Sequence, residues 1–492
     1  MTPAVVVAGW GQVSQGKEVE PTGLVDPMGL MAEASRRAAC STGRPDLLEA
    51  VDGVLVVRVL SRHCPSAADR LADAIGASPR LKVVSGIGGS SPQVLISRAA
   101  AMIARGELDR VLIAGGETYR RREGRRDCTD SALFQGLVGG HEREDMVGAT
   151  DLEERHGVSL PVHGFPLFET ALWAESGLSL DQHLARVGER WSAFSRVAAA
   201  HPQGWATAPR SATEIVTPTA ANRMIAFPYT KFMNPQIYVD LGAAVILERW
   251  DGTRGSGGGR PVFFLGGAEA EHRQHYLVER TSFIDSPPLE IAASRALDRA
   301  GLELDAIECF DLYSCFPCAV TVGMRALGLS PDDERPMTVT GGLGFFGGPG
   351  NNYGLHAVAT MAQTIAEGQR ETGMTTGLSW FMSKQAVGIY GASPPKGDVG
   401  RGHDDRPTVV GDAPISVDEH PAGPGAIDTY TVLYARDGSP ERAVIYGTTA
   451  RGDRFVAGTE ATEEVFEALT TSCQVGRAVR LAPGVENRAE LL

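Results

Sequence analysis

The stretch from Thr340 to Tyr353 is the part of the chain best suited to binding a ligand. It reads T-G-G-L-G-F-F-G-G-P-G-N-N-Y, follows a β-branched run that starts at Met337, and precedes an apolar-periodic segment that starts at Asn352. A glycine-rich turn between a strand and a helix lets backbone N–H groups approach a ligand closely, and the helix dipole favours negative charge there. The stretch contains no His, Cys, Asp, Glu or Lys. It therefore offers close approach without an obvious proton-transfer group.

A C-x-x-C sequence, Cys315-Phe316-Pro317-Cys318, is the other candidate for chemistry. It lies between a predicted strand and a predicted helix, with Cys309 close by, and this is the setting of a redox dithiol. The alternative is a pair of buried, reduced cysteines, because free Cys is among the most buried residue types. No second Cys pair follows at the spacing of a zinc site, so we expect no metal.

Two further patterns have simpler explanations. Residues 342–347 match G-x-G-x-x-G, with Glu367 twenty residues on, as in nicotinamide-nucleotide binding. However, Glu367 falls at a helix end rather than after a second strand. His141, Glu142 and Asp145 lack the i, i+4 His pair of a zinc-protease helix, so we interpret them as loop structure. His356 lies one turn into the helix after Tyr353, and we expect it in the core.

The composition is typical of a large globular protein. The 492 residues allow two to four domains, and the net charge of −14 argues against nucleic-acid binding. No apolar run approaches the length of a membrane span, and the N-terminus lacks the features of a signal peptide. Seven cysteines in a chain of this size fit a reducing cytoplasm.

Short β-rich runs alternate with helical patterns, which predicts an α/β fold with a mostly parallel, covered sheet. The rhythm stops after residue 119, resumes with a strand at 237–249, and starts again after a Gly/Ser-rich linker at 252–259. Both halves have the same order of elements, which suggests an internal duplication. After residue 410 the alternation is that of antiparallel strands, as in a small β-barrel. The predicted strands are residues 5–9, 51–57, 82–85, 110–115, 261–268, 307–312, 337–340 and 374–379. The predicted helices are residues 27–39, 67–75, 92–104, 180–200, 284–300, 316–327 and 352–367.

Several local sequences resemble the thiolase superfamily, nearest the sterol-carrier-type thiolases (acetyl-CoA acetyltransferase-like). Y-L-V-E-R-T-S-F-I-D-S-P-P-L-E-I-A from Tyr276 is similar to the segment that opens the family's C-terminal half, and N-P-Q-I-Y-V-D-L-G-A-A-V-I-L from Asn234 is similar to the strand that closes its N-terminal half. The resemblance implies duplicated βαβαβαββ halves in a five-layer αβαβα core. Residues 1–119 with 236–251 would form the N-terminal half, 120–235 a loop domain, 260–395 the C-terminal half and 410–492 an OB-fold-like domain.

The resemblance also implies that the usual catalyst is missing. Thiolases use a nucleophilic Cys at a helix N-terminus, and here Gly88 in S-G-I-G-G-S-S-P-Q stands at that position. Gly348 replaces the His of the family's Gly-His-Pro motif. Tyr313 replaces the His of the His-Asp-Cys-Phe motif, whose Cys is kept as Cys315, and Ser379 lies where the last catalytic Cys is expected. Claisen or thiolytic chemistry through an acyl-enzyme is therefore not expected.

The family binds coenzyme A, so we expect an acyl-CoA thioester as ligand and no covalently bound cofactor. Candidate contacts are Ser90, Ser91 and Gly347, together with Arg120, Arg121 and Arg122, because the planar guanidinium suits phosphate. For the serines the alternative is a helix N-cap, and for the arginines it is a solvated surface. Monomer and homodimer stay open.

Three functions remain as hypotheses. The first is a carbon–carbon lyase of retro-aldol type in lipid metabolism, with Tyr313, Tyr353 and Cys315 as candidate catalytic residues and N–H groups near Gly88 and Gly348 as the oxyanion site. The second is an acyl-CoA or lipid carrier without catalysis. The third is a residual acyltransferase that uses Cys315 or a Ser.

Overall fold

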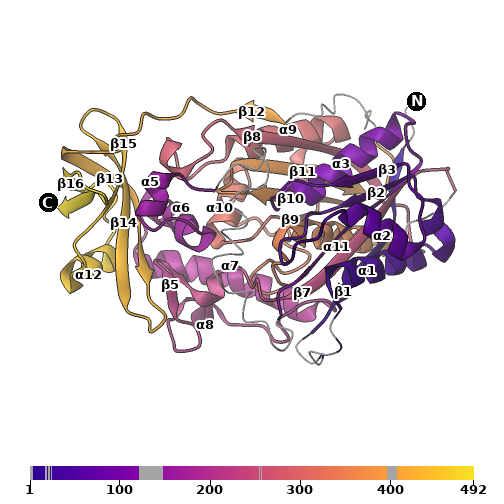
Figure 1. Ribbon diagram of the computed structural model, residues 1–492, viewed down its shortest axis with the longest axis horizontal. Coiled ribbons are helices and arrows are strands. Elements are labelled where there is room, and N and C mark those ends of the chain that lie inside the picture. The colour runs from indigo at the N-terminus through magenta and orange to yellow at the C-terminus, as the bar shows by residue number, and fades with distance from the viewer. Residues whose placement is uncertain are drawn as a thin grey trace.

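Two copies of one strand arrangement meet edge to edge in the core (Figure 1). The computed structural model describes residues 4–16, 19, 23, 25–120, 148–253, 255, 258–395 and 407–492. The core strands are β1 (Val5–Ser14), β2 (Gly53–Val56), β3 (Leu81–Val84), β4 (Arg110–Thr118), β7 (Asp240–Arg249), β8 (Phe263–His272), β9 (Cys309–Asp311), β10 (Thr372–Ser379) and β11 (Lys384–Gly391). They lie in the order β3-β2-β4-β7-β1-β8-β11-β10-β9, and β12 (Thr408–Val410) pairs with β8.

The predicted duplication is visible in the pairing. In the N-terminal half, β2 pairs with β4 in parallel, and β4–β7 and β7–β1 are antiparallel. In the C-terminal half, β9 pairs with β10 in parallel, and β10–β11 and β11–β8 are antiparallel. The halves join where Val6 pairs with Phe263 and the Val7 N–H donates to the Val262 carbonyl at 2.8 Å.

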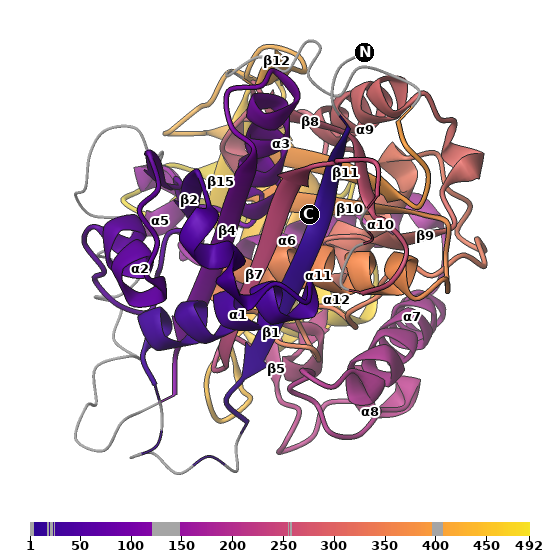
Figure 2. The same ribbon diagram turned by 90° about the vertical axis from the view of Figure 1, so that its right-hand side faces the viewer.

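Helices form three layers around these half-sheets, as the resemblance implied. Helices α1 (Pro27–Ser41) and α2 (Ala67–Ile75) cover the outer face of the N-terminal half (Figure 2), and α9 (Pro287–Ala300) and α10 (Pro317–Ala326) cover that of the other. Helices α3 (Ser91–Ala104) and α11 (Tyr353–Ala366) lie between the halves and share one buried cluster with strands of both. Both inner helices are apolar nearly all round, as expected of helices buried on every side.

The predicted strand at residues 337–340 does not form, and this prediction was wrong. The β-branched residues there fit a strand by propensity, but the Asp311 carboxylate takes their hydrogen bonds instead. Its Oδ2 accepts the N–H groups of Val339 (2.9 Å) and Thr340 (3.1 Å) and the hydroxyls of Thr338 and Thr340 (both 3.0 Å). The Met337 carbonyl still accepts the Leu312 N–H at 3.0 Å. Beyond Met337 the buried side chain of Asp311 replaces a strand partner, and the segment turns directly into the glycine-rich stretch.

The insertion and the C-terminal barrel pack on each other at one end of the molecule (Figure 1). The barrel strands are β13 (Gly423–Tyr434), β14 (Pro440–Thr449), β15 (Arg454–Gly458), β16 (Ala478–Ala482) and β17 (Arg488–Leu491), with helix α12 (Glu463–Thr471). They close in the order β13-β14-β15-β17-β16-β13. The insertion contains α5 (Asp151–Arg155), α6 (Pro161–Ser176), α7 (Leu180–Ala200), α8 (Ala212–Val216), β5 (Met224–Ala226) and β6 (Tyr229–Thr230). Helix α6 and strand β5 both contact β13.

Within the described residues, no helix is long and apolar enough to cross a membrane, and no group of His, Cys, Asp and Glu is arranged to hold a metal. His156 has a structural role: its Nδ1 contacts the Leu152 carbonyl at 2.7 Å, and its Nε2 accepts the Asn487 N–H of the barrel at 2.9 Å. His141, Glu142 and Asp145 lie outside the described residues.

We predict that Asp311→Asn lowers the free energy of unfolding by about 2–3 kcal/mol, the usual value of hydrogen bonds to a buried charged group. An amide has one oxygen acceptor where the carboxylate has two, so either the N–H groups of Val339 and Thr340 or the Tyr353 hydroxyl would face an NH2 group. The measurement is equilibrium unfolding in urea, with the exposed Asp305→Asn as control. Equal stability of both variants would contradict the role assigned to Asp311.

Candidate functional site

The chain positions singled out by the family motifs converge at the N-termini of the two inner helices. Ser90 precedes α3, and its N–H donates to the Ser379 Oγ at 3.1 Å, while the two hydroxyl oxygens lie 2.6 Å apart. The Gly88 N–H donates to the Asn351 Oδ1 at 2.9 Å. Asn351 belongs to the glycine-rich stretch, in the short helix η6 (Gly350–Asn352). Three segments that are far apart in the sequence thus meet within hydrogen-bonding distance.

Position 88, where the resemblance to thiolases places the nucleophilic cysteine, is sterically closed. Gly88 has a φ of +138°, which L side chains rarely adopt, and a Cβ there would lie 2.1 Å from the Ser379 Oγ. The Ser379 hydroxyl therefore occupies the volume that a side chain at position 88 would need. The glycine and the serine fit each other, and together they exclude a cysteine.

Tyr313 packs directly against this glycine loop. A Cβ on Gly89 would lie 2.1 Å from the Tyr313 hydroxyl oxygen, so the hydroxyl rests on the bare backbone of Gly89. The ring meets Tyr353 edge to face, with 5.5 Å between centroids. Burial raises the pKa of Tyr313, so the phenol stays neutral at physiological pH and acts as a hydrogen-bond donor.

Tyr353 is held by the carboxylate that organises residues 338–340. Its hydroxyl donates to the Asp311 Oδ1 at 2.8 Å and lies 2.6 Å from the Thr340 Oγ1. Burial, followed by the charge of Asp311, raises the pKa of Tyr353, and burial raises the pKa of Asp311 as well. The pair can pass a proton, because the phenol oxygen can accept one while its own proton moves to the carboxylate.

Cys315 and Cys318 do not have the environment of a redox or nucleophilic pair. Both are buried free thiols, and burial raises the pKa of each. Thiol chemistry requires the thiolate. The Cys318 Sγ also donates to the Phe165 carbonyl at 3.4 Å. The alternative of a buried, reduced pair therefore describes these residues better than redox function does.

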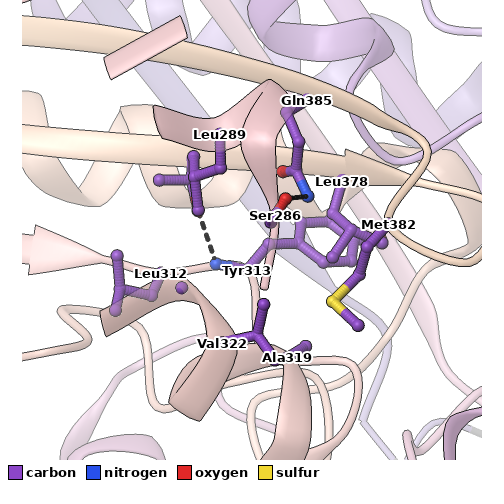
Figure 3. A pocket seen from close by; sticks show the side chains of 11 residues that line it. Ser286, Leu289, Leu312, Tyr313, Ala319, Val322, Leu378, Met382 and Gln385 are labelled. Atoms are coloured by element: carbon purple, nitrogen blue, oxygen red, sulfur yellow. Dashed lines mark hydrogen bonds between the residues drawn. The ribbon is translucent and has the colours of Figure 1, made fainter. Parts of the chain in front are cut away.

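A small cavity lies beside Tyr313 (Figure 3). It is lined by residues from α9, α10, β10 and β11 and by the turn between the last two strands: Ser286, Leu289, Val322, Leu378, Met382 and Gln385 are among them. Its volume of about 10 Å³ is enough for about one water molecule. An acyl group would therefore need these side chains to move.

The glycine-rich stretch packs against the protein rather than opening to a nucleotide. A Cβ on Gly341 would lie 2.3 Å from the Ala198 nitrogen, and one on Gly342 would lie 2.7 Å from the Phe194 ring. One on Gly347 would lie 2.9 Å from Leu241. The Gly348 N–H donates to the Gln236 carbonyl at 2.9 Å. These contacts argue against the nicotinamide alternative, and an oxyanion at Gly88 or Gly348 would have to displace an internal acceptor.

The predicted coenzyme A contacts are only partly described. Arg121 and Arg122 lie outside the described residues. Arg120 donates to the carbonyls of Gln15 and Val19, both at 3.2 Å, so it ties the loop after β1 to the end of β4. Ser91 donates to the Gly86 carbonyl at 3.1 Å and does not cap its helix. The predicted contacts of Arg120, Ser90, Ser91 and Gly347 with coenzyme A therefore stay predictions.

Three polar residues of the site were missed by the sequence analysis: Asn351, Asp311 and Glu117. Glu117 lies at the end of β4, fully buried, and accepts the N–H groups of Leu60 and Ser61, both at 2.7 Å. A Cβ on Gly350 would lie 2.7 Å from its Oε1. Burial raises the pKa of Glu117 to about 7. For Asp311, an acidic residue inside the predicted strand 307–312 was the available signal, whereas Glu117 lies just beyond the predicted strand 110–115.

The fold and the site define a thiolase-type α/β protein with an additional C-terminal barrel. A family model described as the thiolase-like protein type 1 additional C-terminal domain matches residues 406–484. The crystal structure of a monomeric SCP2-thiolase-like protein type 1 from Mycobacterium smegmatis is similar over 100% of this chain and 99% of its own, with 31% identity and a TM-score of 0.80. The chain therefore belongs to the SCP2-thiolase-like proteins of type 1.

Two more distant structures share the fold. An Ltp2-ChsH2(DUF35) aldolase is similar over 79% of this chain and 98% of its own, at 17% identity and a TM-score of 0.62. The Acat5 thiolase from Ascaris suum in complex with coenzyme A is similar over 79% and 99%, at 15% identity and a TM-score of 0.56. No curated protein sequence matches the chain.

We predict that Gly88→Cys lowers stability and does not give a reactive thiol, because the new Cβ overlaps the Ser379 hydroxyl and the backbone at position 88 is strained for any side chain. The expected loss is about 1–3 kcal/mol, typical of overpacking, measured by urea unfolding. Gly88→Cys/Ser379→Gly should recover part of it. The geometry is contradicted if Gly88→Cys is as stable as the wild type and reacts rapidly with iodoacetamide.

Glu117 should make stability depend on pH. Its pKa is about 7 in the folded protein, whereas the ordinary value for a glutamate, which applies to the unfolded chain, is 4.5. The native state therefore holds the proton more tightly, and the stabilisation is complete below pH 4.5 and lost as the pH rises through 7. Between pH 5 and 8 this removes on the order of 3 kcal/mol. Glu117→Gln, which mimics the protonated carboxyl, should flatten that part of the profile in urea unfolding, whereas the exposed Glu49→Gln should not.

Proposed function

We propose that this protein binds acyl-CoA thioesters at the junction of α3, α11 and the β10–β11 turn. The observation that carries the proposal is the convergence of the Tyr313, Ser90 and Ser379 hydroxyls on the bare backbone of Gly88 and Gly89. Hydroxyl groups around a close backbone approach suit a thioester carbonyl, which needs hydrogen-bond donors. The Acat5 thiolase, which shares the fold, is described in complex with coenzyme A.

The reaction that this set of residues supports best is retro-aldol cleavage of a β-hydroxyacyl thioester. Tyr353 accepts the proton of the β-hydroxyl while its own proton moves to Asp311, the Cα–Cβ bond breaks, and a carbonyl forms at Cβ. The electron pair passes to the α-carbon and is delocalised onto the thioester oxygen, where the neutral Tyr313 donates a hydrogen bond. The proton held by the Tyr353–Asp311 pair then returns to the α-carbon. One neighbour of the same fold is an aldolase.

The alternative is a carrier that binds the same thioesters without cleaving them. The closed cavity beside Tyr313 and the buried hydroxyl of Tyr353 favour it, because a carrier does not need to bring a substrate to Tyr353. Residual acyltransferase activity is less well supported, since the pKa of the Cys315 thiol is raised by burial.

The deciding experiment is calorimetric titration with CoA, acetyl-CoA and a long-chain acyl-CoA, followed by product analysis with a β-hydroxyacyl-CoA. We expect micromolar binding that strengthens with the acyl group, and cleavage to a free carbonyl product and a shortened acyl-CoA. Tyr313→Phe and Tyr353→Phe should each lower cleavage by about 100-fold or more and change affinity only a few-fold. Tyr430→Phe is the matched control, because Tyr430 is equally buried and its hydroxyl donates to the Ser472 carbonyl in the barrel, away from the site.

Binding without cleavage by the wild type would establish the carrier alternative. Absence of binding to all three ligands would leave the fold as it is and refute the proposed function.

A further inference from the structure

The turn between β10 and β11 is strained where it borders the site. Trp380 has a φ of +55° and Met382 a φ of +61°. Bulky residues rarely adopt this left-handed conformation, and it persists only where surrounding contacts impose it. Strain of this kind clusters at ligand clamps and switch regions. Contacts from outside the turn must therefore hold it in place.

This turn carries the residues that shape the cavity. Ser379, immediately before it, occupies the volume beside Gly88. Leu378 and Met382 line the cavity next to Tyr313 (Figure 3). A movement of the turn would enlarge or close this space, so the position of the turn sets how much of an acyl group can enter.

A buried arginine holds the turn from the core side. The Arg280 side chain is fully buried, and its Nη2 donates to the Phe381 carbonyl at 2.6 Å. The guanidinium lies over the Phe168 ring, 5.4 Å from the centroid. Its Nε and Nη1 have no hydrogen-bond partner among the described residues. A buried cation is costly to desolvate. Burial of the Arg280 guanidinium therefore lowers the stability of the fold, and the hydrogen bond to the Phe381 carbonyl is formed despite this cost.

The C-terminal barrel holds Arg280 in its position. Arg454 of β15 is 2% exposed, and its guanidinium donates to the Arg280 carbonyl. Its other terminal nitrogen is paired with Asp428 of β13. The guanidinium also lies over the Phe283 ring, 5.6 Å from the centroid, and Phe283 packs edge-on against Phe168. A continuous series of contacts thus runs from the barrel through Arg454 and Arg280 to the strained turn.

We propose that Arg454 and Arg280 are positioning residues through which the C-terminal barrel sets the β10–β11 turn, and with it the size of the acyl cavity at Tyr313. The part that concerns the acyl group rests on the proposed function. The coupling between the barrel and the β10–β11 turn does not depend on the proposed function.

Fluorine NMR of protein labelled with 5-fluorotryptophan tests the turn directly, because Trp380 lies within it. The Trp380 resonance is assigned by its loss in Trp380→Phe. We expect Arg454→Gln to move this resonance by more than its line width and to leave that of Trp250, which packs on Phe263, in place. Arg442→Gln is the control, because Arg442 also joins the barrel to another part of the chain, the insertion at the Arg155 carbonyl, but does not contact Arg280 or the turn through any hydrogen bond that the structure describes.

Asp428→Asn is a milder variant that keeps the test decisive if Arg454→Gln does not fold, since it keeps Arg454 and weakens its support, together with the hydrogen bond from the Thr448 hydroxyl. It should move the Trp380 resonance in the same direction and by less. An unchanged Trp380 resonance in the folded variants, or an equal shift in Arg442→Gln, would overturn the proposal.

The second readout is the ratio of affinities for a long-chain acyl-CoA and for CoA, measured by calorimetry. A displaced turn should change this ratio by about five-fold or more in Arg454→Gln and leave it unchanged in Arg442→Gln. A Trp380 shift with an unchanged ratio supports the coupling of barrel and turn but counts against an acyl pocket at Tyr313. If Arg454→Gln changes neither the Trp380 resonance nor the affinity ratio, the coupling between the barrel and the turn is refuted.

Discussion

Two buried glutamines tie the halves of this protein together, and the site depends on that tie. Gln93 of α3, in the N-terminal half, accepts the hydroxyls of Thr375 (3.0 Å) and Tyr390 (2.9 Å) from strands of the C-terminal half. Gln12 of β1 reaches the opposite inner helix, at Thr360 (3.1 Å) and His356 (2.8 Å). Such buried amides are stable only with their partners in place. The inner helices are thereby held in one register, and their N-termini meet at the site.

This arrangement also decides what chemistry the site can perform. Packing between two half-sheets excludes water, and desolvation disfavours the charged form of every titratable group. Tyr313, Tyr353 and the Cys315 thiol accordingly stay neutral. A neutral phenol is a poor base alone but a good donor to a developing oxyanion. The carboxylate of Asp311 is the group next to Tyr353 that can take a proton, and burial makes it a stronger base.

Local sequence patterns predicted most of the fold, because they reflect burial. Helices at 67–75 and 180–200 have the predicted bounds, and the equal order of strands in both halves supported duplication. Strand β11 was missed, since K-Q-A-V-G-I-Y-G is interrupted by glycine, whose small size makes room for the Gln93 amide at Gly388. The false strand at 337–340 and the unnoticed Asp311 have one cause. An acidic residue inside the predicted strand 307–312 was visible in the sequence, but local periodicity does not show that its carboxylate accepts backbone N–H groups from another segment.

The family motifs indicated the chain positions that converge in the candidate site, whereas the closure of this site was not predictable from them. Each replaced residue can be found by its place in a motif, but a motif does not record which side chain fills the vacated volume. At position 88 the answer is the Ser379 hydroxyl, and at Gly89 it is the Tyr313 hydroxyl. Both come from the other half of the chain. No vacant space is therefore left at position 88, where the resemblance places a catalytic cysteine. Two glycines and two hydroxyl side chains have become mutually complementary, so any function of this site must use the hydroxyls that fill it.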